Sequence, residues 1–289
     1  MDNIIDIVFK HLSRTNQNLT KPKNEVIPMK KTLLVLLFLN IPIFLFSQSQ
    51  KLNIEEAENL FENASYPLAI KFYTKALDIN ESNSIKYYLY YKRASCYYML
   101  KKYKNAIDDA SQALKITTLD KDYTFVKGNA FWLIGRIHSR HDEKEKALSY
   151  FKYAAKILKS SLIINNVGYK QMQLEQYSKA LKSFNESIKL DPSLSYSYNN
   201  RALVYLKLEE INLAKKDIIK AKQLSPQNPY IYKHSALIYL YLNEKEKACA
   251  ELQKAKELNY SKFGSEADAH EVDKLLNENC GIQEKKNRT

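Results

Sequence analysis

The sequence predicts an all-α fold, a solenoid of about six stacked helical hairpins that ends in a capping helix. The first observation is a small side chain that recurs every 33 to 41 residues, at Ala69, Ala106, Ala147, Ala180, Ala214 and Ala248. The second is that two more small residues keep step with it, seven positions later at Ala76, Ala113, Ala154, Ser187, Ala221 and Ala255, and twelve positions earlier at Ala57, Ala94, Gly135, Gly168, Ala202 and Ala236. The third is a low content of helix breakers, with 5 glycines and 7 prolines in 289 residues. A fixed period of this length is the signature of a repeat architecture.

The segment before residue 50 falls outside this period and divides in two. Residues 1–28 hold only a short apolar run, and we expect them to be a disordered, non-native extension, with translation starting at Met29. Residues 29–49 have the layout of a secretory signal peptide: two lysines, an uncharged apolar run and a small polar site. The run is short for a membrane span, which needs ~20 residues. The alternative is an uncleaved signal anchor, in which residues 32–46 contact the membrane.

The array is expected to cover residues 50–262 as six repeats, namely 50–83, 87–120, 128–160, 161–194, 195–228 and 229–262. In the fifth repeat, residues 198–208 are predicted as the first helix and residues 213–224 as the second. Pro226 then ends the unit, because proline cannot continue a helix. The small residues have a packing role, since two helices approach closely only where the side chains between them are short. Ala202 is expected to face Ala214 across this hairpin.

Two repeats carry a family resemblance. The fifth reads Asn199-Asn200-Arg201-Ala202-Leu203-Val204-Tyr205, followed by Ala214, Ile218, Ala221 and Ser225-Pro226, and the fourth matches at Asn166-Val167-Gly168, Tyr177, Ala180, Phe184 and Leu190-Asp191-Pro192. On these residues the chain resembles tetratricopeptide repeat (TPR) proteins, of the exported bacterial type that carries a signal peptide. The resemblance implies that the first helix of each hairpin lines an inner, concave groove.

The C-terminal segment is predicted to close the array. Residues 264–280 form an amphipathic helix on the pattern of Ala269, Val272 and Leu276, and a solenoid needs such a helix to cover its last apolar surface. Residues 281–289 are charged and expected to be disordered.

The cysteines indicate the compartment. Cys249 opens the second helix of the sixth repeat and Cys280 ends the cap, so antiparallel packing would bring their sulfurs together in a disulfide. Disulfides persist in oxidising compartments, which agrees with a signal peptide and places the protein in the periplasm or cell envelope. The alternative is that the two are unrelated small buried residues. Cys96 is expected to be a buried thiol.

Charge and motif content limit the function. The formal net charge is +13, and +10 from 39 basic and 29 acidic residues once residues 1–47 are set aside. The lysines alternate with glutamates, as in residues 144–146, which is typical of a solvated helix face. We therefore expect no nucleic-acid partner, although a basic surface for lipid head groups or an acidic polymer stays open.

Signals for catalysis are absent from the sequence. There is no glycine-rich phosphate loop and no nucleophile in a catalytic context. His138 and His141 have a metal-like spacing, but His138 falls on a core position of its repeat. We expect no enzyme, no cofactor and no metal site.

The candidate site is a partner-binding groove on the first helices. Tyrosine, tryptophan and arginine dominate the energy of protein interfaces, and asparagine can both donate to and accept from a peptide backbone. The resemblance implies an asparagine ladder at Asn166 and Asn200, whereas the carboxylate clamp of some relatives is replaced by Ile54, Glu58, Tyr91 and Ser95. The alternative for any one aromatic residue is packing between hairpins. The predicted groove residues are Tyr88, Tyr91, Tyr98, Trp132, Arg136, Arg140, Asn166, Tyr169, Met172, Gln173, Tyr196, Asn199, Asn200, Lys207, Tyr230, Lys233 and Tyr241.

The predicted function is that of an exported, non-enzymatic scaffold that binds an extended peptide or a protein surface. The alternatives are a membrane-anchored assembly factor that faces the periplasm, and a basic surface for lipid head groups or an acidic polymer.

Overall fold

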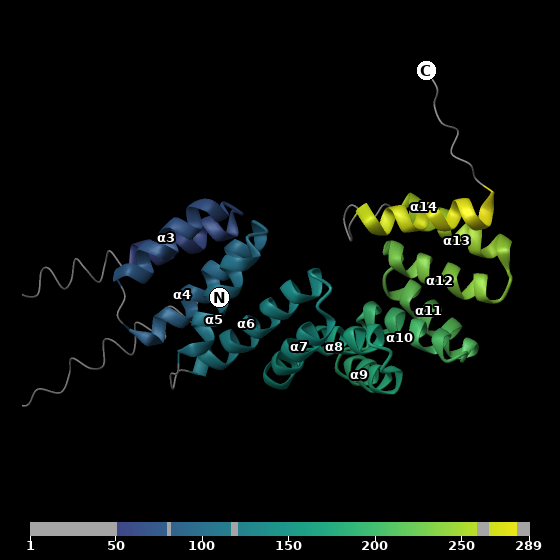
Figure 1. Cartoon of the computed structure of the whole chain (residues 1–289), viewed down its shortest axis with the longest axis horizontal. Helices are drawn as coiled ribbons and strands as arrows, with labels where there is room; N and C mark the ends of the chain where they lie inside the picture. The colour runs from purple at the N-terminus through teal and green to yellow at the C-terminus, as the bar shows by residue number, and fades with distance from the viewer. Residues whose placement is uncertain (1–50, 80–81, 117–120, 259–265, 282–289) are drawn as a thin grey trace, which may run out of the picture. The chain divides into compact units, whose positions relative to one another are not determined.

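The described chain is an all-α solenoid, which confirms the predicted fold class (Figure 1). The structure is a computed structural model of the chain and describes residues 51–79, 82–116, 121–258 and 266–281. The predictions for residues 1–28 and 29–49, and for the tail beyond residue 281, lie outside these residues. A helix over residues 51–62 comes first. The helices that follow are α3 (Tyr66–Ile79), α4 (Asn83–Met99), α5 (Tyr103–Lys115), α6 (Lys121–Arg140), α7 (Lys144–Leu158), α8 (Ser161–Gln173), α9 (Tyr177–Leu190), α10 (Ser195–Lys207), α11 (Ile211–Leu224), α12 (Pro229–Tyr241), α13 (Lys245–Glu257) and α14 (Glu266–Cys280).

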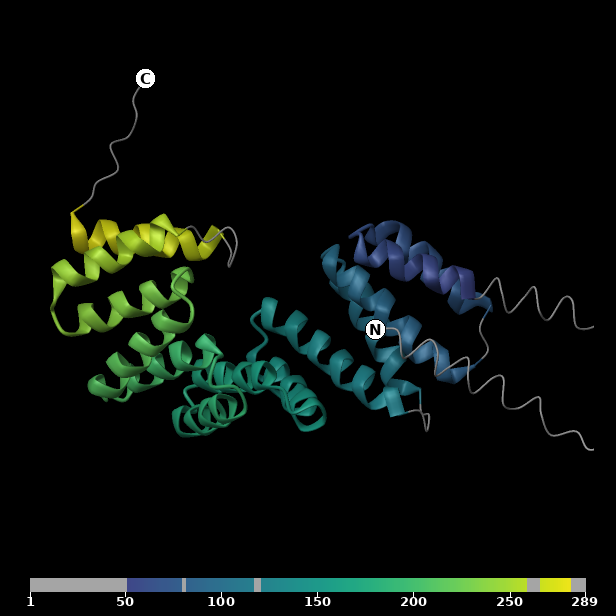
Figure 2. The same ribbon diagram turned by 180° about the vertical axis from the view of Figure 1, so that it is seen from behind.

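Each helix packs mainly against its neighbours in sequence. The pairs α4–α5, α6–α7, α8–α9, α10–α11 and α12–α13 are hairpins, and each hairpin also contacts the next. First helices of consecutive hairpins touch as well, at α4–α6, α8–α10 and α10–α12. Figure 2 shows the same succession from behind. The core is therefore a row of small clusters between neighbours, as in repeat proteins generally.

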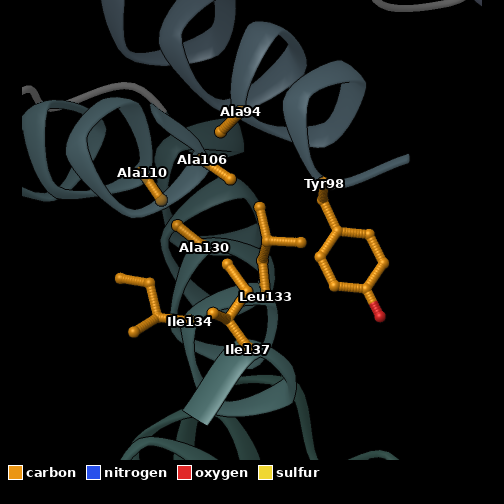
Figure 3. Packing of buried hydrophobic residues seen from close by; sticks show 8 residues of the cluster. All are labelled: Ala94, Tyr98, Ala106, Ala110, Ala130, Leu133, Ile134 and Ile137. Atoms are coloured by element: carbon orange, nitrogen blue, oxygen red, sulfur yellow. The ribbon is translucent and has the colours of Figure 1, made fainter. Parts of the chain in front are cut away.

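The small residues lie where the helices come closest. Ala94, Ala106, Ala202 and Ala214 are all fully buried. Figure 3 shows one such cluster, in which alanines of α4 and α5 meet the larger side chains of α6; its members are Ala94, Tyr98, Ala106, Ala110, Ala130, Leu133, Ile134 and Ile137. Tyr98 lies at the edge of the cluster, and its hydroxyl group points away from the other residues.

Two repeats have glycine at the small position of the first helix, and each has phenylalanine opposite. A Cβ atom at Gly135 would lie 2.7 Å from a ring carbon of Phe151, and one at Gly168 would lie 2.7 Å from a ring carbon of Phe184. Such contacts are too close for a side chain. The glycine is therefore required by the size of the facing ring.

The turn inside every hairpin has one conformation, although its sequence varies. The residue two positions after the first helix has φ between 55° and 60°, at Ala64, Lys101, Asp142, Glu175, Glu209 and Asn243. In the fourth repeat, Gln176 N–H donates to the Gln171 carbonyl at 2.8 Å and Glu175 N–H to the Met172 carbonyl at 2.9 Å. Equivalent bonds occur in the other five turns. This is the Schellman ending of a helix, usually made with glycine.

Several helix ends differ from the sequence predictions. The expected starts of the second and third repeats, residues 87 and 128, lie inside α4 and α6, which have 17 and 20 residues against 13 for α8. In the fifth repeat α10 begins at Ser195, three residues earlier than expected, because the predicted start rested on an apolar residue rather than on the turn before it. The capping helix α14 begins at Glu266.

Candidate functional site

The predicted groove residues lie on the first helices, and they differ widely in exposure. We call this surface of α4, α6, α8, α10 and α12 the first-helix face. Tyr196, Tyr241, Arg140 and Lys207 are exposed, and Tyr98, Asn199, Asn200 and Lys233 are buried. Those that are half-buried are Tyr88, Tyr91, Trp132, Arg136, Asn166, Tyr169, Met172, Gln173 and Tyr230. The face is therefore not a uniform stripe of contact residues.

Two of the predicted asparagines join consecutive first helices. Asn200 Nδ2 on α10 donates to Asn165 Oδ1 on α8 at 3.1 Å, and Asn199 Oδ1 lies 2.9 Å from His234 Nδ1 on α12. Both pairs span 35 residues, one repeat. These amides therefore hold the scaffold together, which differs from their predicted role as partner contacts. Asn165 was missed, although its 35-residue offset from Asn200 was visible in the sequence.

Asn166 differs from these residues. Its side chain is half-buried on α8 and makes no hydrogen bond to any residue of the described ranges. The amide therefore keeps its donors and its acceptor for another molecule.

Lys233 also has a role within the fold. Its Nζ atom on α12 donates to Glu271 of the cap at 2.9 Å, and the side chain is 8% exposed. This differs from the predicted partner contact, because the burial of a lysine requires an acidic partner. The ion pair helps to fasten α14 to the array.

A half-buried carboxylate, Glu58 of the helix over residues 51–62, lies beside α4 at the N-terminal end of the first-helix face. Glu58 accepts from the Tyr73 hydroxyl at 2.6 Å and from the Tyr88 hydroxyl at 3.0 Å, and Lys92 Nζ lies 2.5 Å from its other oxygen. Burial, followed by the charge of Glu58, raises the pKa of Tyr88 above its usual range. The Tyr88 hydroxyl is thus engaged within the protein. A carboxylate at this position is also unsuited to hold a second carboxylate.

Four predicted residues meet between α4 and α6. The Arg136 guanidinium lies over the ring of Tyr98, at 4.6 Å from its centroid, and over the ring of Trp132, at 4.9 Å. Arg140 Nε donates to the Tyr98 hydroxyl at 3.0 Å, a bond that raises the pKa of the guanidinium. Trp132 packs against the apolar cluster of α7 and α8, and its buried Nε1 atom has no acceptor among the described residues. We call these four residues the arginine–aromatic cluster.

A second group lies on α8. Gln173 Nε2 donates to the Tyr169 hydroxyl at 3.4 Å, and Lys170 Nζ donates to Gln173 Oε1 at 2.7 Å. Lys170 was missed by sequence reasoning, and its burial lowers the pKa of its ammonium group. Tyr169 and Met172 pack against Phe184, so both are partly structural.

Cys249 and Cys280 lie within bonding distance of each other, and Cys96 is buried. The sulfur atoms of Cys249 on α13 and Cys280 on α14 are 2.00 Å apart, and their Cα atoms are 5.7 Å apart. Cys96 is buried, and its burial raises the pKa of the thiol to about 12.

The described ranges contain no group of three metal-ligating side chains. His138 bonds to Glu143 and stacks on Tyr150, so its ring has a structural role. Among the helices of the described residues, none combines the length and apolar character that a membrane span requires.

Comparisons with known proteins identify the repeats. Residues 168–209 match the family model described as TPR repeat, and residues 195–228 match the one described as tetratricopeptide repeat. A TPR repeat-containing protein of Methanocaldococcus jannaschii is 28% identical over 137 residues, which are 47% of this chain and 22% of that protein. The heat shock protein STI1 of Saccharomyces cerevisiae is 30% identical over 95 residues, 32% of this chain and 16% of that protein. The chain thus spans less than a quarter of the length of these relatives.

Solved structures show the same architecture. The crystal structure of YrrB, described as a TPR protein with an unusual peptide-binding site, has a TM-score of 0.51 and 22% identity, and the match covers 62% of this chain and 88% of YrrB. PilF of Pseudomonas aeruginosa has a TM-score of 0.60 and 15% identity over 80% of this chain and 99% of PilF. Identities this low support the fold alone, and the fold is that of a TPR solenoid.

Proposed function

We propose that this solenoid of tetratricopeptide repeats is a non-enzymatic scaffold, and that it binds an extended peptide or a protein surface on its first-helix face. The observation that carries the proposal is an unused amide on that face. The half-buried Asn166 side chain makes no hydrogen bond with the described residues. A peptide backbone supplies both a carbonyl and an amide N–H for such a side chain.

Aromatic side chains on the same face supply apolar contact area. Tyr196 and Tyr241 are 40% and 48% exposed, on the first helices of the fifth and sixth repeats. Tyrosine and tryptophan are enriched among residues that dominate binding energy. YrrB, which has the same fold, is described as having a peptide-binding site, and this precedent favours the same use here.

The test is a crosslinked pull-down from intact cells with the natural chain and two triple variants. The first variant replaces Trp132, Tyr169 and Tyr196 with alanine on the first-helix face. The matched control replaces Tyr153, Leu213 and Ile219, which are exposed on second helices. We expect a partner that the natural chain and the control capture and that the first variant loses, with unchanged helicity. If only the control variant lost the partner, the binding site would lie on the second helices instead.

Salt distinguishes the alternative of a basic surface for lipid head groups or an acidic polymer. Binding to such a surface should collapse as ionic strength rises, because exposed charges are screened within about 10 Å at 0.1 M salt. Contacts of buried aromatic groups should persist.

We also propose that the protein is exported, that residues 29–49 are removed as a signal peptide, and that Cys249 and Cys280 are oxidised in the periplasm or cell envelope. The mass of the mature protein after alkylation tests all three points. A retained segment 32–46 would favour the membrane-anchored alternative, and two alkylated thiols at Cys249 and Cys280 would contradict an oxidising location.

A further inference from the structure

The four arginines in the described ranges fall into two classes. Arg93 and Arg201 belong to the first class. Arg93 donates from Nε and Nη2 to both oxygens of Asp109 at 2.6 and 2.8 Å, and Arg201 makes the same pair of bonds to Asp217 at 2.7 and 2.8 Å. These arginines are neutralised by a carboxylate and hold their hairpins together.

Arg136 and Arg140 form the second class. They lie one turn apart on α6, and within the described ranges neither has a carboxylate at ion-pair distance. Their neighbours are aromatic. Arg136 lies over Tyr98 and Trp132, and Arg140 bonds to the Tyr98 hydroxyl.

This arrangement has an electrostatic consequence. Like charges four residues apart on a helix repel each other, and no carboxylate of the described residues pairs with either arginine. Lys92 on α4 pairs with Glu58, so it is not an uncompensated charge of this kind. An anion bound between them would remove the repulsion.

The aromatic rings make the site suited to one kind of anion. Tyr98 and Trp132 hold the plane of Arg136 in place, so little side-chain entropy is lost on binding. A fixed guanidinium fork matches the two oxygens of a carboxylate. The half-buried Tyr91, on α4 beside Arg136, adds apolar surface for the next residue of a peptide.

We propose that Arg136 and Arg140 are the specificity-determining residues of the groove, and that they accept an aspartate or glutamate side chain of an extended peptide. This inference rests on the proposed function, because it names the chemistry of the segment that the first-helix face binds.

The experiment begins with a random dodecapeptide phage library selected on the full chain. We expect the selected peptides to carry Asp or Glu next to an aromatic or aliphatic residue. Affinity is then measured by fluorescence anisotropy for one selected peptide and for its copy with Asn or Gln in place of the acidic residue. The unaltered protein should bind the copy about tenfold to a hundredfold more weakly, as expected for hydrogen bonds to a charged group.

Protein variants assign this loss to the two arginines. The double variant Arg136→Gln with Arg140→Gln should bind the acidic peptide more weakly by a similar factor. Its affinity for the amide copy should be almost unchanged. The matched control is Lys216→Gln with Lys220→Gln, which removes two exposed charges one turn apart on α11. It should change the affinity less than about threefold, because distant exposed charges are screened.

Each contrary result has a definite meaning. Equal losses in both double variants would overturn the site in favour of general electrostatic attraction. The selected peptides could lack acidic residues and still fail to bind the Trp132, Tyr169 and Tyr196 triple variant. That result would support the groove as the binding site and overturn the carboxylate site. A library with no enriched peptide would overturn the carboxylate site and the binding of extended peptides, and the pull-down would then decide whether the face binds a protein surface. Circular dichroism shows whether the arginine double variant is folded. If it is not, the affinities of the unaltered protein for the acidic peptide and for its amide copy decide whether the site binds a carboxylate.

Discussion

Arg93 and Arg201 occupy equivalent positions in the second and fifth repeats and make equivalent contacts. Each is paired with an aspartate 16 residues later and also reaches the preceding hairpin, through Thr74 or Asn185. Each arginine therefore joins three helices through one side chain. The Asp109 and Asp217 partners are less than a tenth exposed, so each has the arginine as its main polar contact in place of water.

Replacing Arg201 with methionine should lower the free energy of unfolding by about 3 kcal/mol, because it leaves the buried Asp217 carboxylate without its partner. Urea denaturation followed by circular dichroism measures the change. The matched control replaces Asp217 with leucine in the same chain, which should recover much of the loss because no buried charge remains. A single variant as stable as the natural chain would show that water reaches the aspartate.

At the scale of the element, the hairpin turns share one backbone geometry that their sequences do not predict. All six use a left-handed residue other than glycine, and the backbone bonds of the Schellman ending are present in each. A left-handed conformation disfavours a side chain by roughly 1–2 kcal/mol. Packing of the two helices on either side outweighs that cost.

Glu209→Gly should stabilise the protein by roughly 0.5–1 kcal/mol, because glycine removes the strain at φ 60° while adding some entropy to the unfolded chain. Glu209 is exposed and makes no ion pair with the described residues, so no contact is lost. Urea denaturation measures the difference, with Glu209→Ala as a control that should leave stability nearly unchanged. A glycine variant less stable than the alanine variant would contradict the strain argument.

At Gly168, the small position of the first helix in the fourth repeat, glycine is required for lack of space rather than for backbone conformation. Alanine there would favour the helix but would place its Cβ atom 2.7 Å from the Phe184 ring. We expect Gly168→Ala to destabilise by about 1–3 kcal/mol through overpacking. In a Phe184→Leu background the same change should cost less, and thermal unfolding of the four chains tests this. Equal costs in both backgrounds would mean that the ring is not the obstacle.

At the scale of the whole molecule, the contacts of the described array run mainly within a hairpin and between consecutive hairpins. Stability is then a sum of repeat terms and interface terms, so a local change is felt locally. The cap illustrates this. Val272 and Leu276 of α14 are buried against α12 and α13, and Lys256 Nζ lies 2.8 Å from Asp273. These contacts belong to the last repeat alone.

Replacing Cys249 and Cys280 with serine should destabilise the cap by about 3–4 kcal/mol, because the bridge closes a separation of 31 residues. Hydrogen exchange should then speed up in α12 to α14 and stay unchanged in α4 to α7. Cys96→Ala, in a buried thiol outside the cap, is the control that should leave exchange in α14 unchanged. Uniform acceleration along the chain would contradict local stability.

The sequence by itself determined the fold class, because the small residues that set the period are also the residues that let helices pack closely. Ala202 and Ala214 needed no knowledge of distant contacts to be placed in a core. The expected helix starts near residues 87 and 128 came later than α4 and α6 begin, because the periodic core positions do not mark where a longer first helix starts.

Only the tertiary structure decided how the polar and charged residues of the first-helix face are used. Asn199, Asn200 and Lys233 read in sequence as partner contacts, but each bonds to a residue of a neighbouring helix. Within the described ranges, Arg93 and Arg201 each meet an aspartate, whereas Arg136 and Arg140 meet none. The physical reason is that hydrogen bonding depends on which groups the rotation and spacing of separate helices bring within about 3 Å, and that arrangement is set between repeats rather than within one.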